Sequence, residues 1–64
     1  MGNYRAYILG DDHHIIERVD LVACKDDEAA TRCAKLLVVG QIVELWDGHR
    51  LIATFEPQAL RHVG

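Results

Sequence analysis

The residues best suited to acid–base or metal chemistry stand together in one short segment, Asp11-Asp12-His13-His14. Imidazole and carboxylate groups are suitable ligands for zinc and similar ions. The spacing is poor, because adjacent residues of an extended chain point to opposite sides, whereas a shared ion needs ligands two apart on a strand or four apart on a helix. Further ligands would have to come from His49 or His62. A polar turn explains the same residues without a ligand, so a metal or small-ligand site at residues 11–14 is the alternative hypothesis only.

Nucleophilic chemistry has little support in this chain. Cys24 and Cys33 are nine residues apart, which is not the spacing of a Cys-x-x-Cys redox or zinc motif. Cys33 belongs to an apolar helix stripe, where a thiol behaves as a small hydrophobe, and a bridge to Cys24 is geometrically possible but not favoured in a reducing compartment. The chain has no serine, which excludes a serine triad, and its glycines are isolated rather than gathered in a phosphate-binding loop. We therefore expect no enzymatic activity and no cofactor.

Length and composition limit the class of protein. The 64 residues suffice for one domain, which we expect to span residues 1–64, with a core at about 4–56 and a C-terminal tail at 57–64. So small a core is marginal, and small domains usually gain stability from disulfides, a metal or a partner subunit. The net charge of −3 argues against nucleic-acid binding, and no apolar run approaches the ~20 residues that span a bilayer. Since the first residues lack a signal-peptide pattern, we expect a cytoplasmic protein with reduced thiols.

The secondary-structure elements that position these residues can be read from the sequence pattern. Residues 4–9 are aromatic and β-branched and predict a first strand, and residues 15–23 alternate in polarity and predict a second strand antiparallel to it. Asp26 is a typical N-cap residue and predicts a helix over about 26–39, with Gly40 as its left-handed C-terminal cap. The apolar stripe of this helix is formed by Ala30, Cys33, Ala34 and Leu37.

Two further apolar-alternating runs meet at Asp47-Gly48, which is a strong signal of a β-hairpin. A two-residue loop would place Trp46 opposite His49, whereas a three-residue loop with a bulge at Gly48 would place Glu44 opposite Arg50. We favour the bulged register, because it pairs opposite charges and gathers on one side Val43, Leu45, Leu51, Ala53 and Phe55. The predicted fold class is α+β, a two-layer ββαββ arrangement with one helix packed on one face of a four-stranded, largely antiparallel sheet. The strand order stays open.

One helix covers one face of such a sheet, so the opposite face is left uncovered. By strand parity, the covered side is predicted to hold Tyr4, Ala6, Ile8, Val19, Leu21, Ala23, Val43, Leu45, Leu51, Ala53 and Phe55. The uncovered side is predicted to hold Arg5, Tyr7, Leu9, Arg18, Asp20, Val22, Ile42, Glu44, Trp46, Arg50, Ile52 and Thr54. Half of this second set is apolar, and it contains Trp, Tyr and Arg, the residue types enriched at binding hot spots.

Contact with another protein is the function that the uncovered side favours. The residues expected to bind the partner are Tyr7, Ile42, Trp46, Arg50 and Ile52. The partner would be a second copy, making a homodimer sheet to sheet or by addition of an edge strand, or an unidentified protein. Two other interpretations compete. In one, arginine side chains simply cover the apolar residues of a solvated face. In the other, the face is a platform for single-stranded nucleic acid, which we do not expect, because Asp20 and Glu44 share the face and the chain is acidic.

The segments that carry a family resemblance are structural, namely Tyr4-Arg5-Ala6-Tyr7, Val19-Asp20-Leu21, Asp26-Asp27-Glu28-Ala29 and Val43-Glu44-Leu45-Trp46-Asp47-Gly48. Together they resemble a group of short uncharacterised alphaproteobacterial proteins of ββαββ pattern, over about residues 4–57. The resemblance implies a bacterial cytosolic origin and a standalone domain, and it implies no activity and no catalytic residues. His13-His14 and Leu37-Val38-Val39 depart from the pattern of that group and add nothing to the resemblance.

Overall fold

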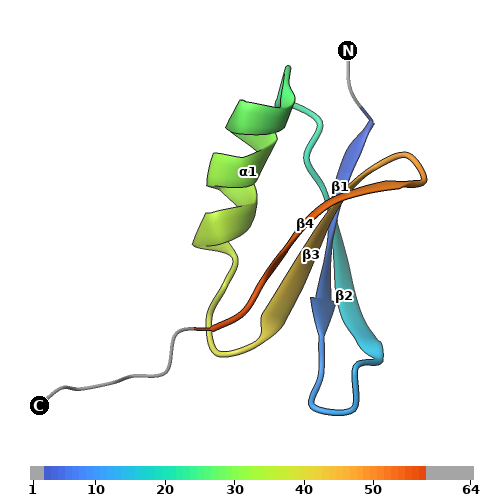
Figure 1. Ribbon diagram of the computed structural model, residues 1–64, viewed down its shortest axis with the longest axis vertical. Helices are drawn as coiled ribbons and strands as arrows, with labels where there is room; N and C mark the ends of the chain where they lie inside the picture. Colours follow the sequence, from blue (N-terminus) through green and yellow to red (C-terminus); the bar gives the residue numbers. More distant parts are fainter. Residues whose placement is uncertain (1–2, 58–64) are drawn as a thin grey trace, which may run out of the picture.

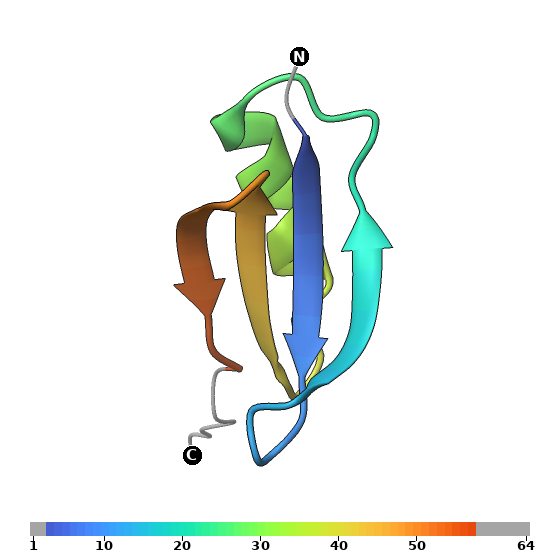
Figure 2. The same ribbon diagram turned by 90° about the vertical axis from the view of Figure 1, so that its right-hand side faces the viewer.

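Four strands form one sheet, and a single helix packs against one side of it (Figure 1). The computed structural model describes residues 3–57. The elements are β1 (Tyr4–Leu9), β2 (Ile15–Asp20), α1 (Asp27–Leu36), β3 (Ile42–Asp47) and β4 (Arg50–Phe55). The strand order across the sheet is β2-β1-β3-β4, and every pair of neighbouring strands is antiparallel. The predicted α+β class and ββαββ order are confirmed, and Figure 2 shows the helix behind the sheet.

Helix α1 begins where the sequence predicts, because the Asp26 carboxylate accepts a hydrogen bond from a backbone amide of the first turn at 2.8 Å. It ends at Leu36, earlier than predicted. The Leu37 amide donates to the Ala34 carbonyl at 2.9 Å, and such an i→i−3 bond tightens and closes the last turn. Two β-branched valines follow, and Gly40 adopts its left-handed conformation (φ +79°) in the connection to β3 rather than at the helix cap. Within the described residues, no helix is long and apolar enough to cross a membrane.

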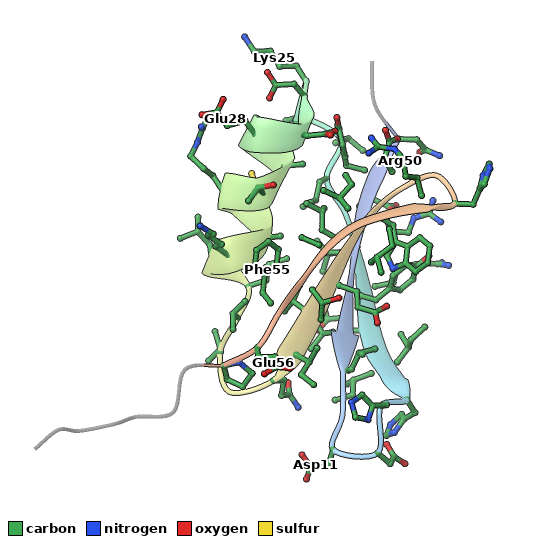
Figure 3. The ribbon with its side chains drawn as sticks, in the orientation of Figure 1. Asp11, Lys25, Glu28, Arg50, Phe55 and Glu56 are labelled. Atoms are coloured by element: carbon green, nitrogen blue, oxygen red, sulfur yellow. The ribbon has the colours of Figure 1, made fainter. Side chains whose placement is uncertain are left out.

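The core lies between α1 and the sheet, and it includes Tyr4 and Ala6 of β1 as well as residues of β3 and β4. Ala30 and Ala34 are fully buried on the helix, and their small side chains allow it to approach Val43 and Leu45, which are fully buried on β3. Phe55 packs against this core from β4, between the strand and the helix (Figure 3). All four residues of the predicted helix stripe belong to the core or pack against it, so the stripe is confirmed. Strand β2 is at the edge of the sheet that the helix does not cover, and most of its side chains are exposed.

The loop of the β3–β4 hairpin is one residue shorter than predicted and begins two residues later. It consists of Gly48-His49, and Asp47 lies opposite Arg50. Gly48 has a φ of +64°, which a two-residue hairpin loop requires at its first position and which glycine adopts without strain. The predicted pairing of Glu44 with Arg50 is wrong, because Glu44 lies opposite Thr54.

A β-bulge in β4 decides which of its apolar side chains leave the core. The bulge makes Ile52 the extra residue between two ladder pairs. Leu51 lies opposite Trp46 on the uncovered side and is 47% exposed, so the prediction that it is internal is wrong. Ile52 is half-buried and packs against the core, so the prediction that it faces outward is also wrong. The bulge keeps Phe55 on the side that faces the helix, but it exchanges the sides on which Leu51 and Ile52 lie.

The chain leaves the sheet earlier after β2 than the sequence predicts. Strand β2 ends at Asp20, although the Leu21 amide still donates to the Tyr4 carbonyl at 3.0 Å. The following residues turn toward the start of the helix. Ala23, predicted to be internal, is exposed as a result, and Cys24 takes the buried position instead, with 8% of its surface exposed.

Candidate functional site

The uncovered side of the sheet, called the open face below, faces the viewer in Figure 2, with the helix behind the sheet. It carries three rows of side chains that run across the strands. The strand pairing defines these rows, because residues directly opposite each other point to the same side. The first row consists of Asp20, Arg5, Trp46 and Leu51. The second row consists of Arg18, Tyr7, Glu44 and Thr54. The third row consists of Ile15, Leu9 and Ile42.

One aromatic contact and two polar contacts organise the first two rows. The rings of Tyr7 and Trp46 meet edge to face, with their centroids 6.4 Å apart and their planes at 82°, an arrangement that the ring quadrupoles favour. Trp46 Nε1 donates a hydrogen bond to Glu44 Oε1 at 3.1 Å, and Arg5 Nε donates one to Asp20 Oδ1 at 2.9 Å. These contacts fix two partly exposed aromatic rings at the centre of the open face.

The second row also holds two charged side chains that make no ion pair with any residue the structure describes. Arg18 on β2 and Glu44 on β3 flank Tyr7 on β1. Neighbouring strands are ~4.8 Å apart, so the two charges stand about 10 Å from each other across β1. A surface that matches this row therefore needs an anion over Arg18 and a cation over Glu44.

The third row forms a small apolar cluster at the end of the open face nearest the β1–β2 loop. Leu9 is only 5% exposed although it points away from the helix, and its row neighbours are Ile15 and Ile42. Ile15 itself is 55% exposed. The open face therefore offers apolar area beside the charges of the second row.

Three of the five residues predicted to bind a partner lie together on the open face, and two do not. The three are Tyr7, Ile42 and Trp46. Ile52 packs against the core, and Arg50 reaches toward the helix, with its Nη2 3.3 Å from Asp27 Oδ1 (Figure 3). The open face gains Leu51, which the predicted register had placed in the core.

Arg50 belongs to a polar network that the sequence pattern did not reveal. Its Nη2 donates to Asp47 Oδ2 at 3.0 Å and to Asp27 Oδ1 at 3.3 Å, and the Tyr4 hydroxyl donates to the same Asp27 oxygen at 2.7 Å. The hydrogen bond to Asp27 raises the pKa of Tyr4 to about 12. The hydrogen bonds from Tyr4 and Arg50 lower the pKa of Asp27, and those from the Asn3 backbone and Arg50 lower the pKa of Asp47. The network ties the first turn of α1 to β1 and to the β3–β4 hairpin.

Residues 11–14, the alternative metal site, fold as a tight polar turn. The Asp12 carboxylate contacts His14 Nδ1 and also accepts a hydrogen bond from the His14 amide at 3.2 Å, while the Gly10 amide donates to the His14 carbonyl at 2.8 Å. The contact with His14 lowers the pKa of Asp12. His49 lies in the hairpin loop at the opposite end of the sheet, and His62 lies outside the described residues. Within the described part of the chain, no three His, Cys, Asp or Glu side chains come close enough to share an ion.

No protein-family model matches the chain, and neither does any curated protein or any solved structure. Similarity therefore adds no substrate, partner or assembly to the geometry described above. The rows of the open face are the features of the molecule that point to a function.

Proposed function

We propose that this chain is a small non-enzymatic interaction module whose open face packs against the open face of a second copy. The observation that carries the proposal is the second row, where Arg18 and Glu44 flank Tyr7 and form no ion pair within residues 3–57. An identical row, turned over, supplies both missing charges. A partly apolar face on a domain of 64 residues also gains stability from burial against a partner.

A twofold axis that runs along β1, between two stacked sheets, meets these requirements. Rotation about this axis exchanges the two sides of β1, so Arg18 of each copy stands over Glu44 of the other. Tyr7 lies near the axis and meets its own counterpart. In the third row, Ile15 stands over Ile42 of the second copy, which joins two apolar side chains. Sheets packed face to face keep their strands within about 30° of each other, which preserves this alignment near the axis.

The size of the open face sets the expected strength of the dimer. Four strands of six residues, spaced ~4.8 Å apart, outline a face of roughly 400 Å² on each copy. Two copies therefore bury on the order of 800–1,000 Å², which is at the small end of the range for specific interfaces. We expect a reversible dimer with a Kd in roughly the micromolar to millimolar range.

Charge exchange between the two flanking residues tests the proposed geometry. Arg18→Glu and Glu44→Arg each place like charges opposite one another, so each should weaken the dimer by about tenfold or more. The double variant Arg18→Glu/Glu44→Arg restores both attractive pairs and should recover association close to that of the wild type. Sedimentation equilibrium over a wide range of concentrations measures all four dissociation constants.

Glu17→Arg is the matched control for these variants. Glu17 is the exposed neighbour of Arg18 on β2 and points to the other side of the sheet. The dimer of the Glu17→Arg variant should have the same dissociation constant as the wild-type dimer. A chain that stays monomeric up to about 1 mM, or a double variant that does not recover, contradicts the proposal. An equal loss of association in Glu17→Arg and Arg18→Glu also contradicts it, because the copies would then join through the edge of β2.

A further inference from the structure

Two thiols touch one another on the helix side of the molecule, away from the open face. Cys24 Sγ lies 3.3 Å from Cys33 Sγ, and both cysteines are free. Cys24 is in the segment between β2 and α1, outside any helix or strand, and Cys33 is on α1. The sulfur atoms of a disulfide are ~2.0 Å apart, so an approach of about 1.3 Å would join these two.

The segment that carries Cys24 is only weakly held in place. The Cys24 amide donates a hydrogen bond of 3.3 Å to the Leu21 carbonyl. This distance is longer than the usual ~2.9 Å, so the hydrogen bond is weak. Since Cys24 belongs to no strand ladder and no helix, the approach of its sulfur disrupts neither. Cys33 can stay in place on the helix, where the neighbouring Ala34 is fully buried.

A groove at the surface leads from solvent to the cysteine pair. This groove, of about 600 Å³, includes both cysteines and is otherwise lined by Ala23, Ala29, Arg32, Lys35 and Leu36. Its two basic side chains attract reagents that carry carboxylates. Cys33 is partly exposed whereas Cys24 is buried, so a reagent in this groove meets Cys33 first.

We propose that Cys24 and Cys33 form a reversible intramolecular disulfide by exchange with a low-molecular-weight disulfide. The Cys33 thiolate attacks one sulfur of the reagent and forms a mixed disulfide, while the other half of the reagent leaves as a thiolate. Cys24 then gives up its proton to water, and its sulfur attacks the Cys33 sulfur and expels the second half as a thiolate. The protein loses two protons and two electrons in total, and the reagent is reduced to two thiols.

The environments of the two thiols suit this order of events. Burial raises the pKa of the Cys24 thiol, and the neighbouring Cys33 raises it further. A buried protonated thiol is a poor first nucleophile. The same thiol is well placed for the second step, because the sulfur that it must attack is already in contact with it.

Exchange with oxidised glutathione, followed by acid quenching and mass spectrometry, tests the proposal on the full chain. Trypsin cuts after Lys25 and Arg32, so it separates Cys24 in peptide 19–25 from Cys33 in peptide 33–35. The expected product is this pair of peptides joined by a disulfide, within a monomer that carries no glutathione and is lighter by two hydrogen atoms. Added dithiothreitol should restore the reduced mass.

Two single variants separate the steps. Cys24→Ser should stop at the mixed disulfide and keep one glutathione on Cys33. Cys33→Ser should react at least roughly tenfold more slowly, because only the buried thiol remains. Three results would overturn the proposal. The wild-type chain could keep a bound glutathione, or stay reduced under conditions that modify Cys24→Ser. It could also form a disulfide between two copies. The dimer on the open face is measured in reduced protein and does not involve the thiols, so the two proposals fail independently.

Discussion

The hydroxyl of Tyr4 donates the hydrogen bond that joins the first strand to the Asp27 carboxylate at the start of the helix. Because this hydrogen bond raises the pKa of Tyr4 to about 12, the folded protein holds the phenolic proton more tightly than the unfolded chain does, whose tyrosine pKa is ~10. The contribution to stability is complete below pH ~10 and is lost as the pH rises toward 12.

Alkaline titration therefore gives the first prediction. Tyrosinate absorbance of the folded chain should contain a component that titrates near pH 12, and Tyr4→Phe should remove that component. The free energy of unfolding in urea should fall between pH ~10 and pH ~12 in the wild type and less steeply in Tyr4→Phe. An unchanged high-pH component in Tyr4→Phe would show that the tyrosine hydrogen-bonded to Asp27 is not its source.

Acid titration tests the two carboxylates of the same network, whose contribution to stability is lost as the pH falls rather than as it rises. Hydrogen bonds lower the pKa of both Asp27 and Asp47 in the folded protein, so their contribution is present above the unfolded value of ~3.9 and is lost as the pH falls through the lower folded values. Urea unfolding should show stability that declines from pH ~5 downward. Asp27→Asn should flatten this decline, whereas Asp11→Asn, in the exposed first loop, should leave it unchanged.

The network also marks the limit of prediction for single residues. A first-turn carboxylate such as Asp27 is explained by the helix dipole alone, and nothing local in the sequence indicates its contacts with Tyr4 and Arg50. Arg50 was predicted to pair with Glu44 because the two residues were placed directly opposite. Its true partners come from a turn of helix and a strand end that only the folded chain brings together.

Among the elements, helix α1 depends on its N-cap. The Asp26 carboxylate accepts a hydrogen bond from the Ala29 amide at 2.8 Å, which satisfies one of the free donors of the first turn. Asp26→Ala should lower the free energy of unfolding by about 1 kcal/mol, and Asp26→Ser, which keeps a capping oxygen, by less than about 0.5 kcal/mol. Urea denaturation measures both, and equal losses in the two variants would contradict the capping role.

The bulge in β4 gives a prediction about strand register. Ile52→Ala should cost about 1–2 kcal/mol, because a half-buried side chain that packs against the core is truncated. Leu51→Ala should change stability by less than about 0.5 kcal/mol at concentrations where the chain is monomeric, since Leu51 lies on the open face. The predicted register without this bulge would give the reverse order, so urea denaturation of the pair distinguishes the two.

Local signals predicted the elements well where chemistry is local and poorly where it is not. Residues 4–9, the Asp26 cap and the presence of the second hairpin follow from side-chain types within a few positions of each other. The helix end at Leu36 and the bulge at Ile52 depend on where the chain must go next and on which side the helix lies. Periodicity carries no information about either.

At the scale of the whole molecule, the cross-link between Cys24 and Cys33 should stabilise a small domain strongly. A disulfide that closes a loop of this length removes chain entropy from the unfolded state, worth at most about 3 kcal/mol. For a domain of this size the oxidised form should melt roughly 10 °C above the reduced form. Differential scanning calorimetry of the two forms measures the shift, and Cys24→Ser/Cys33→Ser provides the control, which should not respond to oxidant.

The sequence predicts part of the open face but not its charge pattern, because that pattern depends on the order of the strands in the sheet. Tyr7, Ile42 and Trp46 reach the open face by strand parity alone, so the sequence suffices to place them. The row that aligns Arg18, Tyr7 and Glu44 requires β1 to stand between β2 and β3. Strand order could not be derived from the sequence, so the charge pattern on which the proposed dimer depends was not visible there.

The central position of β1 has a consequence for how the chain folds. The β1–β2 hairpin and α1 each form from residues that are close in the sequence. The pairing of β1 with β3 joins residues on either side of both elements, so it can form only after β3 has been brought back beside β1. Val43 and Leu45, the largest fully buried side chains within residues 3–57, reach the core only with that pairing. Among the three strand pairings, this one closes the longest loop and therefore costs the most loop-closure entropy. We infer that an isolated segment ending before β3 lacks a core, and that the molecule gains its tertiary structure in one cooperative step when β3 docks beside β1.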